Sequence, residues 1–487
     1  MGAVSATGLF SQGEQLLEQC KLDEAVQLLT CLLADTPQHW QARAARGRAY
    51  YQLKQYDKSL DDYYEALALQ PNSPNLKCNL AVLLKELGQL DIAEHLLREV
   101  LEAVPDHLAA WSNLGVLKHY QLDYTTAIHC HEQAIRLGNH SAASWNNMGQ
   151  TLTSATFVDQ AIHAYQRALQ LDASLNIARF NLAIALFMAG RYREAWSAYE
   201  ARWDSVLVAR YTTHRWKGQP LGTATLLIWT EQGLGDTLQM VRCLARIQQA
   251  QPNARIVLAC PPSFHRLFSC LADIECVDIA VPITYFDWQI PLMSLGACLQ
   301  LELTTLPAVP YLMPDKTLIQ HWATCISHLA RHTKRVGIVW ETGTWGTGIV
   351  DHSRQNKSIP YPLFQTLLHS MDCDFFSLQL TPPPEHRADW GPAPYTLPIR
   401  DFADTAAIIA NLDLVISVDT SVVHLAGAMG KPVWILMRYE DAPFLGIQGE
   451  RTPWYPSAHI IRQSSPGNWH TVIEQTQQRL AAAWTAS

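Results

Sequence analysis

The sequence has no apolar run approaching the ~18 residues that a membrane-spanning helix requires. Its start lacks the basic segment followed by an apolar one that marks a signal peptide, and Ala6 does not fit the myristoylation pattern. A basic excess is also missing, since 36 Lys and Arg face 44 Asp and Glu, which argues against a general nucleic-acid binder. We therefore expect a soluble, cytoplasmic protein, with peripheral membrane association left open.

Cysteine spacing gives no sign of a metal site. The 11 cysteines are odd in number and contain no Cys-x-x-Cys pair, which favours buried reduced thiols over a disulfide framework or a zinc site. We expect no bound metal and a reducing compartment. An apolar content of 48% is that of a globular protein, and 487 residues predict two to four domains.

The first part of the chain repeats with a period of 34 residues, as Pro37, Pro71 and Pro105 show. Small residues recur in the same register at Gly13, Gly47, Ala81, Gly115, Gly149 and Ala183. This period is typical of tetratricopeptide repeats, in which small residues let two antiparallel helices approach closely. One unit cannot bury its own apolar face, so neighbouring units stack. We predict about six units and a superhelical domain over residues 1–209.

Two features of this region bear on binding. The sixth unit departs from the pattern in Trp196–Trp203, which we interpret as a capping helix that packs against the next domain. The concave face of such an array normally binds a peptide or partner protein. Polar residues that recur near one register of the first helices are Asn113, Asn146, Asn147 and Asn181. They would either grip a peptide backbone or lie on the helix surface without a ligand.

From about residue 222, strand-like and helical stretches alternate, which predicts mostly parallel sheets covered by helices. The expected strands are Leu226–Trp229, Arg255–Ala259, Ile274–Val277, Trp288–Leu292, Arg335–Trp340, Asp374–Leu378, Leu412–Val418 and Pro432–Leu436. Helices are expected at 317–332 and 469–484. We predict two half-domains, residues 210–320 and 333–487, with ligands beyond the carboxyl ends of the strands.

The turn Gly233-Leu-Gly-Asp236 follows the first of these strands. It lacks the third glycine of the dinucleotide fingerprint and the Gly-Lys-Ser/Thr of a Walker A loop. On the residues alone, Asp236 is either the N-cap of the following helix or a catalytic carboxylate.

A second polar turn lies between two apolar strands. Asp419, Thr420 and Ser421 follow one strand, and His424 lies on the first turn of the next helix. Hydroxyls and free N–H groups at a helix N-terminus suit a diphosphate. The alternative is a capped helix with a chance histidine.

Two further stretches allow two interpretations each. Arg354 and Lys357 follow a Gly-rich segment and would either close over a phosphate or form a solvated loop. Asp404 and Thr405 begin a helix, where capping explains them as well as ligand contact does. Together with Trp340, they are candidate donor contacts.

These parts together resemble a known combination. The repeats, the Gly-x-Gly-Asp turn and the motif over 419–432, Asp-Thr-Ser-x-x-His-Leu-Ala-Gly-Ala-x-Gly-Lys-Pro, are similar to bacterial repeat-containing glycosyltransferases. Their catalytic part resembles the heptosyltransferase family. The resemblance covers nearly the whole chain. It implies an N-terminal α-solenoid followed by a GT-B fold of two Rossmann-like half-domains.

The resemblance also implies roles for residues. Asp236 matches the general base, the acceptor-side loop holds Gly233, Gly235 and Gln239, and the residues matching the donor-phosphate site are Asp419, Thr420, Ser421, His424, Lys357 and Arg354. Transfer would be inverting and metal-independent, with a nucleotide-diphosphate sugar as co-substrate and no cofactor. The stretch Met437–Ile447 departs from the aromatic- and Arg-rich segment usual there, which bears on donor specificity and activity.

We therefore expect a glycosyltransferase whose repeats recruit a protein acceptor, as in O-linked N-acetylglucosamine transferases. One alternative is transfer to a glycan or lipid-linked sugar, with the repeats used for assembly. The other is a non-catalytic scaffold with a degenerate transferase-like domain.

Overall fold

The computed structural model describes residues 6–138, 140–307, 309–343, 356–369, 373–380, 393–440, 443–446 and 449–485. Arg354 and part of the 437–447 segment lie outside these residues. The chain forms two compact units. Along the sequence, the first unit gives way to the second between Thr151 and Leu152, near the end of helix α9 (Ala142–Ser154). Each unit is described by itself.

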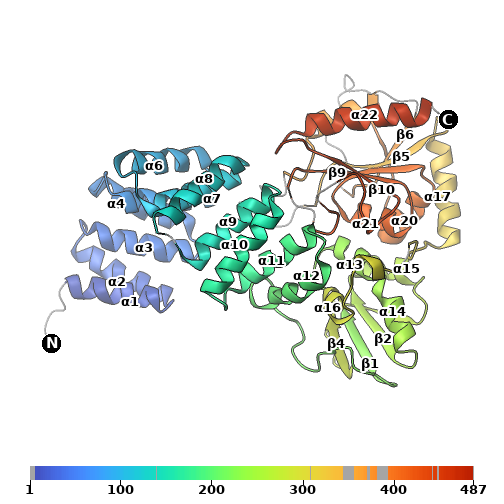
Figure 1. Cartoon of the computed structure of the whole chain (residues 1–487), viewed down its shortest axis with the longest axis horizontal. Helices are drawn as coiled ribbons and strands as arrows, with labels where there is room; N and C mark the ends of the chain where they lie inside the picture. The colour runs from blue at the N-terminus through green and yellow to red at the C-terminus, as the bar shows by residue number, and fades with distance from the viewer. Residues whose placement is uncertain are drawn as a thin grey trace. The chain divides into compact units, whose positions relative to one another are not determined.

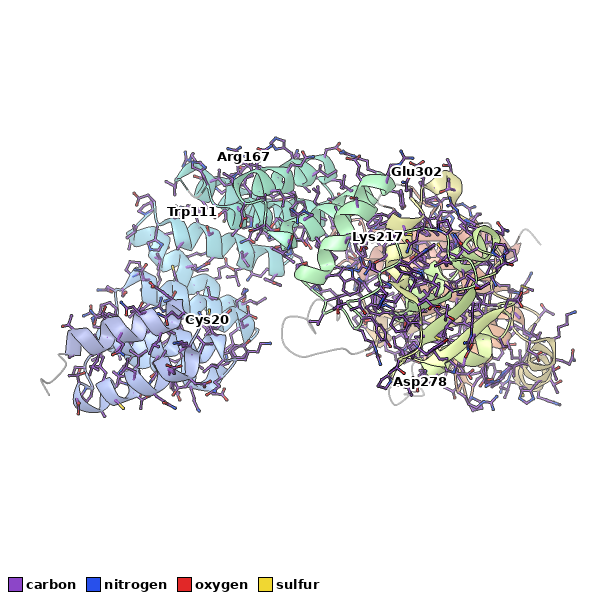
Figure 2. The ribbon with its side chains drawn as sticks, turned by 90° about the horizontal axis from the view of Figure 1, so that it is seen from below. Cys20, Trp111, Arg167, Lys217, Asp278 and Glu302 are labelled. Atoms are coloured by element: carbon purple, nitrogen blue, oxygen red, sulfur yellow. The ribbon has the colours of Figure 1, made fainter. Side chains whose placement is uncertain are left out.

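The first unit is built from helices that pair in antiparallel fashion (Figure 1). They are α1 Ala6–Glu18, α2 Leu22–Asp35, α3 Trp40–Gln52, α4 Tyr56–Leu69, α5 Pro74–Glu86, α6 Leu90–Ala103, α7 Leu108–Tyr120, α8 Tyr124–Arg136 and α9 Ala142–Ser154. A Cβ added at Gly13 would lie 2.7 Å from the Leu29 side chain, so the helices of one pair approach as predicted. Trp111 on α7, labelled in Figure 2, donates through Nε1 to the Pro105 carbonyl at 2.8 Å.

The second unit opens with three more helices of the repeat region. These are α10 Val158–Leu171, α11 Asn176–Met188 and α12 Tyr192–Tyr199, followed by the 3-10 turn η1 Glu200–Asp204. The predicted α-solenoid of about twelve helices is therefore present. The expectation of a capping helix is also confirmed: Trp196 packs so closely on Gly296 that a Cβ there would lie 2.2 Å from its ring. Tyr192 Oη accepts a hydrogen bond of 3.0 Å from Trp454 Nε1.

Two parallel sheets follow, as predicted. The first has the order β3-β2-β1-β4, with β1 Thr225–Trp229, β2 Arg255–Cys260, β3 Ile274–Asp278 and β4 Trp288–Pro291. Its helices are α13 Leu234–Met240, α14 Cys243–Ala250, α15 His265–Phe268 and α16 Leu295–Cys298, with 3-10 turns η2 Pro262–Phe264, η3 Leu292–Ser294 and η4 Leu303–Thr305.

The second sheet has the order β10-β9-β8-β5-β6-β7. Its strands are β5 Arg335–Val339, β6 Asp374–Ser377, β7 Tyr395–Thr396, β8 Leu414–Val418, β9 Val433–Met437 and β10 Ala458–Arg462. The helices are α17 Lys316–Leu329, α19 Tyr361–Phe364, α20 Phe402–Ala410, α21 Ser421–Ala428 and α22 Trp469–Thr485, with the turn η5 Gln365–His369. Helix α17 ends three residues before the predicted bound.

The central strands position the two polar turns. Every residue of β1 and of β8 is buried, as expected of parallel strands covered on both faces. The carboxyl end of β1 leads into α13, and that of β8 leads into α21. These two short helices pack against each other, and Figure 1 shows them side by side. The Gly233–Asp236 turn and the Asp419–His424 turn therefore meet at one place.

No helix in the described residues combines the length and the apolar character needed to cross a bilayer.

Candidate active site at the junction of two strand ends

Asp236 is not the N-cap residue of helix α13, as the capping interpretation supposed, but its side chain still serves a capping box at this helix end. Gly233 is the N-cap residue, and Asp236 is at the third helical position. The Asp236 Oδ2 atom accepts a hydrogen bond of 3.0 Å from the Gly233 backbone N–H. A Cβ at position 233 would lie 3.1 Å from that oxygen, so glycine makes room for the carboxylate.

The surroundings of Asp236 raise the pKa of its carboxyl group. Burial raises the pKa of Asp236 to about 6, assisted by the negative charge of Asp419 and opposed by the Gly233 N–H and the Lys357 ammonium. A carboxylate whose pKa lies near neutrality is suited to take a proton from a hydroxyl.

The second turn forms a helix terminus with polar groups around it. Thr420 is the N-cap of α21, and its Oγ1 lies 3.0 Å from Ser417 Oγ. Ser421 is the first helical residue. The first N–H groups of a helix have no partner within the helix and point at any anion bound there. Thr420 and Ser421 therefore both lie at the N-terminus of α21.

A lysine from the connection between β5 and α19 reaches this turn. Lys357 Nζ lies 3.4 Å from Asp419 Oδ2. Burial alone would raise the pKa of Asp419, but the charges of Lys357, His424 and Arg438 outweigh it, and the pKa is lowered. Asp419 is thus ionised at neutral pH beside a cation that a phosphate could share.

Arg438 is a residue that the sequence analysis did not select. It directly follows β9, the neighbour of β8, and it acts electrostatically on Asp419. Its Nε lies 3.4 Å from Glu440 Oε2. In the sequence, the segment 437–447 stands out only as a departure from a family pattern. The available signal was positional, because carboxyl ends of adjacent parallel strands lie at one sheet edge.

His424 and Gln239 face the contact between α13 and α21. His424 is buried, its Nδ1 lies 3.0 Å from Tyr455 Oη, and burial lowers its pKa. A Cβ at Gly235 would lie 2.7 Å from His424 Cδ2, so glycine allows this approach. Gln239, one helical turn beyond Gly235, is fully buried, and neither polar atom of its side chain has a hydrogen-bond partner among the described residues.

The candidate donor contacts are Trp340, Thr405 and Asp404. Trp340 is buried and packs against the rings of Tyr361 and Phe364. Thr405 Oγ1 donates to the Asp401 carbonyl within the first turn of α20. These two side chains are occupied by packing and helix-end contacts.

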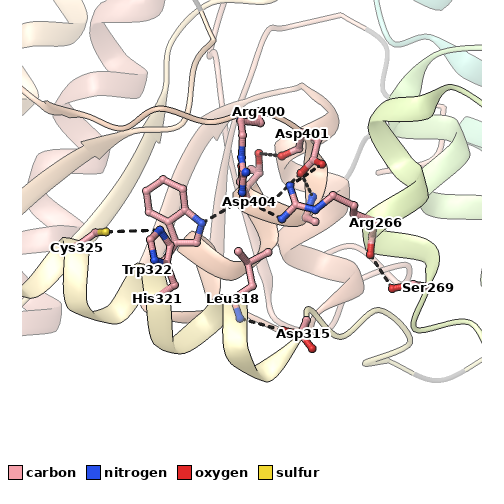
Figure 3. Close-up of polar contacts among 12 residues, drawn as sticks. Arg266, Ser269, Asp315, Leu318, His321, Trp322, Cys325, Arg400, Asp401 and Asp404 are labelled. Atoms are coloured by element: carbon pink, nitrogen blue, oxygen red, sulfur yellow. Dashed lines mark hydrogen bonds and ion pairs between the residues drawn. The ribbon is translucent and has the colours of Figure 1, made fainter.

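Asp404 is fully buried in a cluster of donors (Figure 3). Its carboxylate accepts from Arg400 Nε at 2.7 Å, from Arg266 Nη2 at 3.3 Å and from Trp322 Nε1 at 3.3 Å. Burial opposes its charge, but these donors lower the pKa of Asp404 to about 2. Because Arg266 comes from α15 and Trp322 from α17, Asp404 ties separate elements together.

A second buried network lies next to the Gly233 turn. Arg202, from the end of the repeat region, is fully buried, and its Nη2 lies 2.9 Å from Glu231 Oε1 and 2.6 Å from Ser294 Oγ. The guanidinium also lies 4.3 Å from the Trp203 ring centroid. Burial raises the pKa of Glu231 to about 7 despite the Arg202 charge. Sequence reasoning missed this pair.

All 11 cysteines are free thiols, as predicted, but Cys20, Cys31 and Cys270 are exposed, so the expectation that the thiols are buried is wrong for these three. Within the part of the chain that the structure describes, no group of three or more His, Cys, Asp or Glu is arranged to hold a metal ion.

Comparisons with known proteins match segments in both parts of the chain. Residues 47–88 match a TPR repeat model, and residues 78–128 and 146–205 match a tetratricopeptide repeat model. Residues 396–480 match glycosyltransferase family 9 (heptosyltransferase). This last match includes β8, α21 and β9, which carry Asp419, His424 and Arg438.

Curated relatives and solved structures are similar to this chain, among them the three that follow. Protein FlbA of Caulobacter vibrioides is 27% identical over 485 residues, covering 93% of this chain and 79% of that protein. Human protein O-mannosyl-transferase TMTC1 is 32% identical over 92 residues, covering 18% of this chain and 10% of that protein. The Cut9 and Hcn1 complex of APC/C has a TM-score of 0.40 at 19% identity, covering 42% of this chain and 41% of that one. The comparisons therefore support a glycosyltransferase in which tetratricopeptide repeats precede a region, residues 396–480, that is similar to glycosyltransferase family 9.

Proposed function

We propose that the chain transfers a sugar from a nucleotide-diphosphate donor to an acceptor hydroxyl, with inversion and without a metal ion, on a GT-B fold. The observation that supports this most is that a carboxylate suited to act as a base lies close to a helix end suited to bind an anion. Asp236, a carboxylate with a pKa of about 6, approaches a helix N-terminus beside Lys357. The first suits proton removal and the second suits a diphosphate.

The chemistry assigns one task to each side. Asp236 takes the proton of the acceptor hydroxyl. The oxygen of that hydroxyl attacks the anomeric carbon from the face opposite the diphosphate. The bond from that carbon to the diphosphate oxygen breaks, and negative charge grows on the leaving group. Lys357, Arg438 and the N–H groups of α21 stabilise that charge, which is where such groups contribute most.

Substitution of the base tests this mechanism. Asp236→Asn should reduce product formation from a panel of nucleotide-diphosphate sugars by about 10²- to 10⁴-fold, the usual contribution of a general base. Asp273→Asn is the matched control, because Asp273 is exposed in the same half and its positive φ of 58° also suits Asn. An unchanged rate for Asp236→Asn would remove Asp236 as the base.

We further propose that the repeats recruit a protein acceptor. Asn113 and Asn147 are both half-buried on first helices of the repeats, where an amide can hydrogen-bond a peptide backbone. The double variant Asn113→Ala, Asn147→Ala should lose transfer to protein and keep hydrolysis of the donor. Unaffected protein glycosylation would favour transfer to a glycan or lipid-linked sugar. Hydrolysis of no donor by the wild-type chain would favour a scaffold. The free thiols are compatible with the expected cytoplasmic location.

A further inference from the structure

Arg202 lies in the 3-10 turn η1, directly after the last repeat helix, and it is fully buried. Its Nη1 donates to Glu200 Oε1 at 2.7 Å and to the Tyr199 carbonyl oxygen at 3.3 Å. Its Nη2 donates to Glu231 Oε1 at 2.9 Å and to Ser294 Oγ at 2.6 Å. The four N–H groups of the two terminal nitrogens thus each have an acceptor. The guanidinium is therefore fixed in place, and it joins three separate segments of the second unit.

Glu231 lies in the loop that joins β1 to α13, two residues before Gly233. Its Oε1 atom accepts from Arg202 Nη2 and also from the Met293 backbone N–H at 3.2 Å. Its Oε2 atom is buried and has no hydrogen-bond partner among the described residues. The loop is therefore anchored through one carboxylate oxygen, and an oxygen in that place is what the anchor requires.

The anchored loop carries the group that holds the base. The Gly233 N–H, two residues after Glu231, donates to Asp236 Oδ2 at 3.0 Å. Helix α13 also packs against η3, the turn that contains Met293 and Ser294. A shift of Glu231 would therefore move the Gly233 N–H and, with it, the Asp236 carboxylate. Misplacement of a reacting group by about 1 Å can lower a rate by about 10²-fold.

We propose that Arg202 and Glu231 are positioning residues for the transfer reaction, through which the end of the repeat region sets the place of the Gly233–Asp236 turn. The inference rests on the proposed function, because it takes Asp236 to be the base. The active site is then incomplete without η1, which follows the last repeat helix. The repeat region therefore affects the rate of transfer as well as the choice of acceptor.

Two substitutions of Glu231 separate position from charge, when kcat is measured above the pKa of Glu231, which is about 7. Glu231→Gln loses the charge but keeps an oxygen that can accept from Arg202 and Met293, whereas Glu231→Leu loses both. We expect Glu231→Leu to lower kcat about 10²-fold and Glu231→Gln to stay within about 5-fold of wild type. Affinity for a nucleoside diphosphate in calorimetry should change in neither variant. Equal losses of kcat in the two variants would overturn the proposal.

Asp374→Asn is the matched control. Asp374 is another buried carboxylate that orders a loop, because it accepts from the Arg331 and His332 backbone N–H groups at 2.7 Å each. It is the first residue of β6, at the amino end of the strand and away from the carboxyl ends that lead into the candidate site. The variant should lose stability in denaturant unfolding and keep the wild-type kcat. A loss of kcat as large as that of Glu231→Leu would attribute both losses to stability and overturn the proposal.

The effect on the rate should depend on the base. In an Asp236→Asn background, Glu231→Leu should cause little further loss of kcat, since residues that act as a unit are not additive. A structural defect unrelated to the base would lower kcat by the same factor in both backgrounds, and that result would contradict the assignment.

Hydrogen exchange of the full chain tests the geometry without turnover. The Gly233 amide proton, which is bonded to Asp236, should exchange faster in Arg202→Met and Glu231→Leu than in wild type. If Arg202→Met does not fold, Ser294→Ala removes one acceptor of the same guanidinium and should give a smaller increase. Unchanged exchange in the folded variants overturns the proposal. If the wild-type chain turns over no donor, the proposed function fails, while the exchange rates still decide whether this network holds the turn.

Discussion

Gly235 holds α13 at the distance from α21 on which the active site depends, and Gly235→Ala tests this. The added Cβ would lie 2.7 Å from His424 Cδ2, whereas ordinary van der Waals contact begins at 3.4 Å. Helix α13 or the histidine ring must therefore move by about 0.7 Å. Because Asp236 is the next residue along α13, the displacement also moves its carboxylate relative to Asp419.

Gly235→Ala should affect both the stability of the fold and the rate of the reaction. Overpacking of this size destabilises a fold by about 1–3 kcal/mol. Misplacement of a reacting group by about 1 Å can lower a rate by about 10²-fold. We therefore expect Gly235→Ala to lower kcat by about 10- to 100-fold, in addition to its effect on the midpoint of thermal unfolding.

Gly337→Ala is the matched control. A Cβ there would also lie 2.7 Å from its neighbours, in this case Leu378 and Leu412 in the core beside β5. The two variants should lose similar stability in denaturant unfolding. Only Gly235→Ala should lose kcat when activity is measured per folded molecule. Equal kcat values for the two variants would refute the view that this helix contact sets the geometry of Asp236.

Three further outcomes follow from the same residues. The kcat/KM of the wild-type chain should fall as pH drops through about 6, because the raised pKa of Asp236 means that it becomes protonated there; a pH profile that is flat between 5 and 7 contradicts the assignment. Lys357→Ala and Arg438→Ala should each weaken binding of a nucleoside diphosphate by about 10-fold in calorimetry, since a hydrogen bond to a charged group contributes about 1.5–3 kcal/mol, and no change in either variant would move the diphosphate elsewhere. Asp404→Asn should lower the free energy of unfolding while leaving KM unchanged. The stabilisation by Asp404 should be present above pH 3.8 and lost as pH falls toward its folded-state pKa of about 2. An altered KM in this variant would show that Asp404 contacts the donor.

The sequence allowed the fold to be predicted because its signals are local. A period of 34 residues, apolar runs and the two polar turns each lie within one short segment. The buried strands β1 and β8 are examples, because continuous apolar runs are what a covered parallel strand requires. The resemblance to the heptosyltransferase family also implied that Asp236 and Asp419 belong to one site.

What could not be predicted depends on contacts between distant segments. His424 meets Tyr455 from 31 residues away, and Asp404 meets Arg266 from 138 residues away. No spacing rule relates such pairs. Asp404 therefore could not be assigned to a structural ion pair rather than a ligand contact. Arg438 differs from these pairs, because its place directly after a predicted strand was a signal that could have been used.

The packing of α12 has a consequence for how such proteins can be recombined. Trp196 fills a space that only a glycine at 296 leaves open, and Tyr192 bonds a tryptophan 262 residues further along the chain. The last helical hairpin is thus part of the folding unit of the transferase region. A chimaera that exchanges the repeat array should keep residues from α10 onward with their own transferase. During evolution, repeats can be added or lost ahead of that hairpin, whereas the hairpin itself must change together with Gly296 and Trp454.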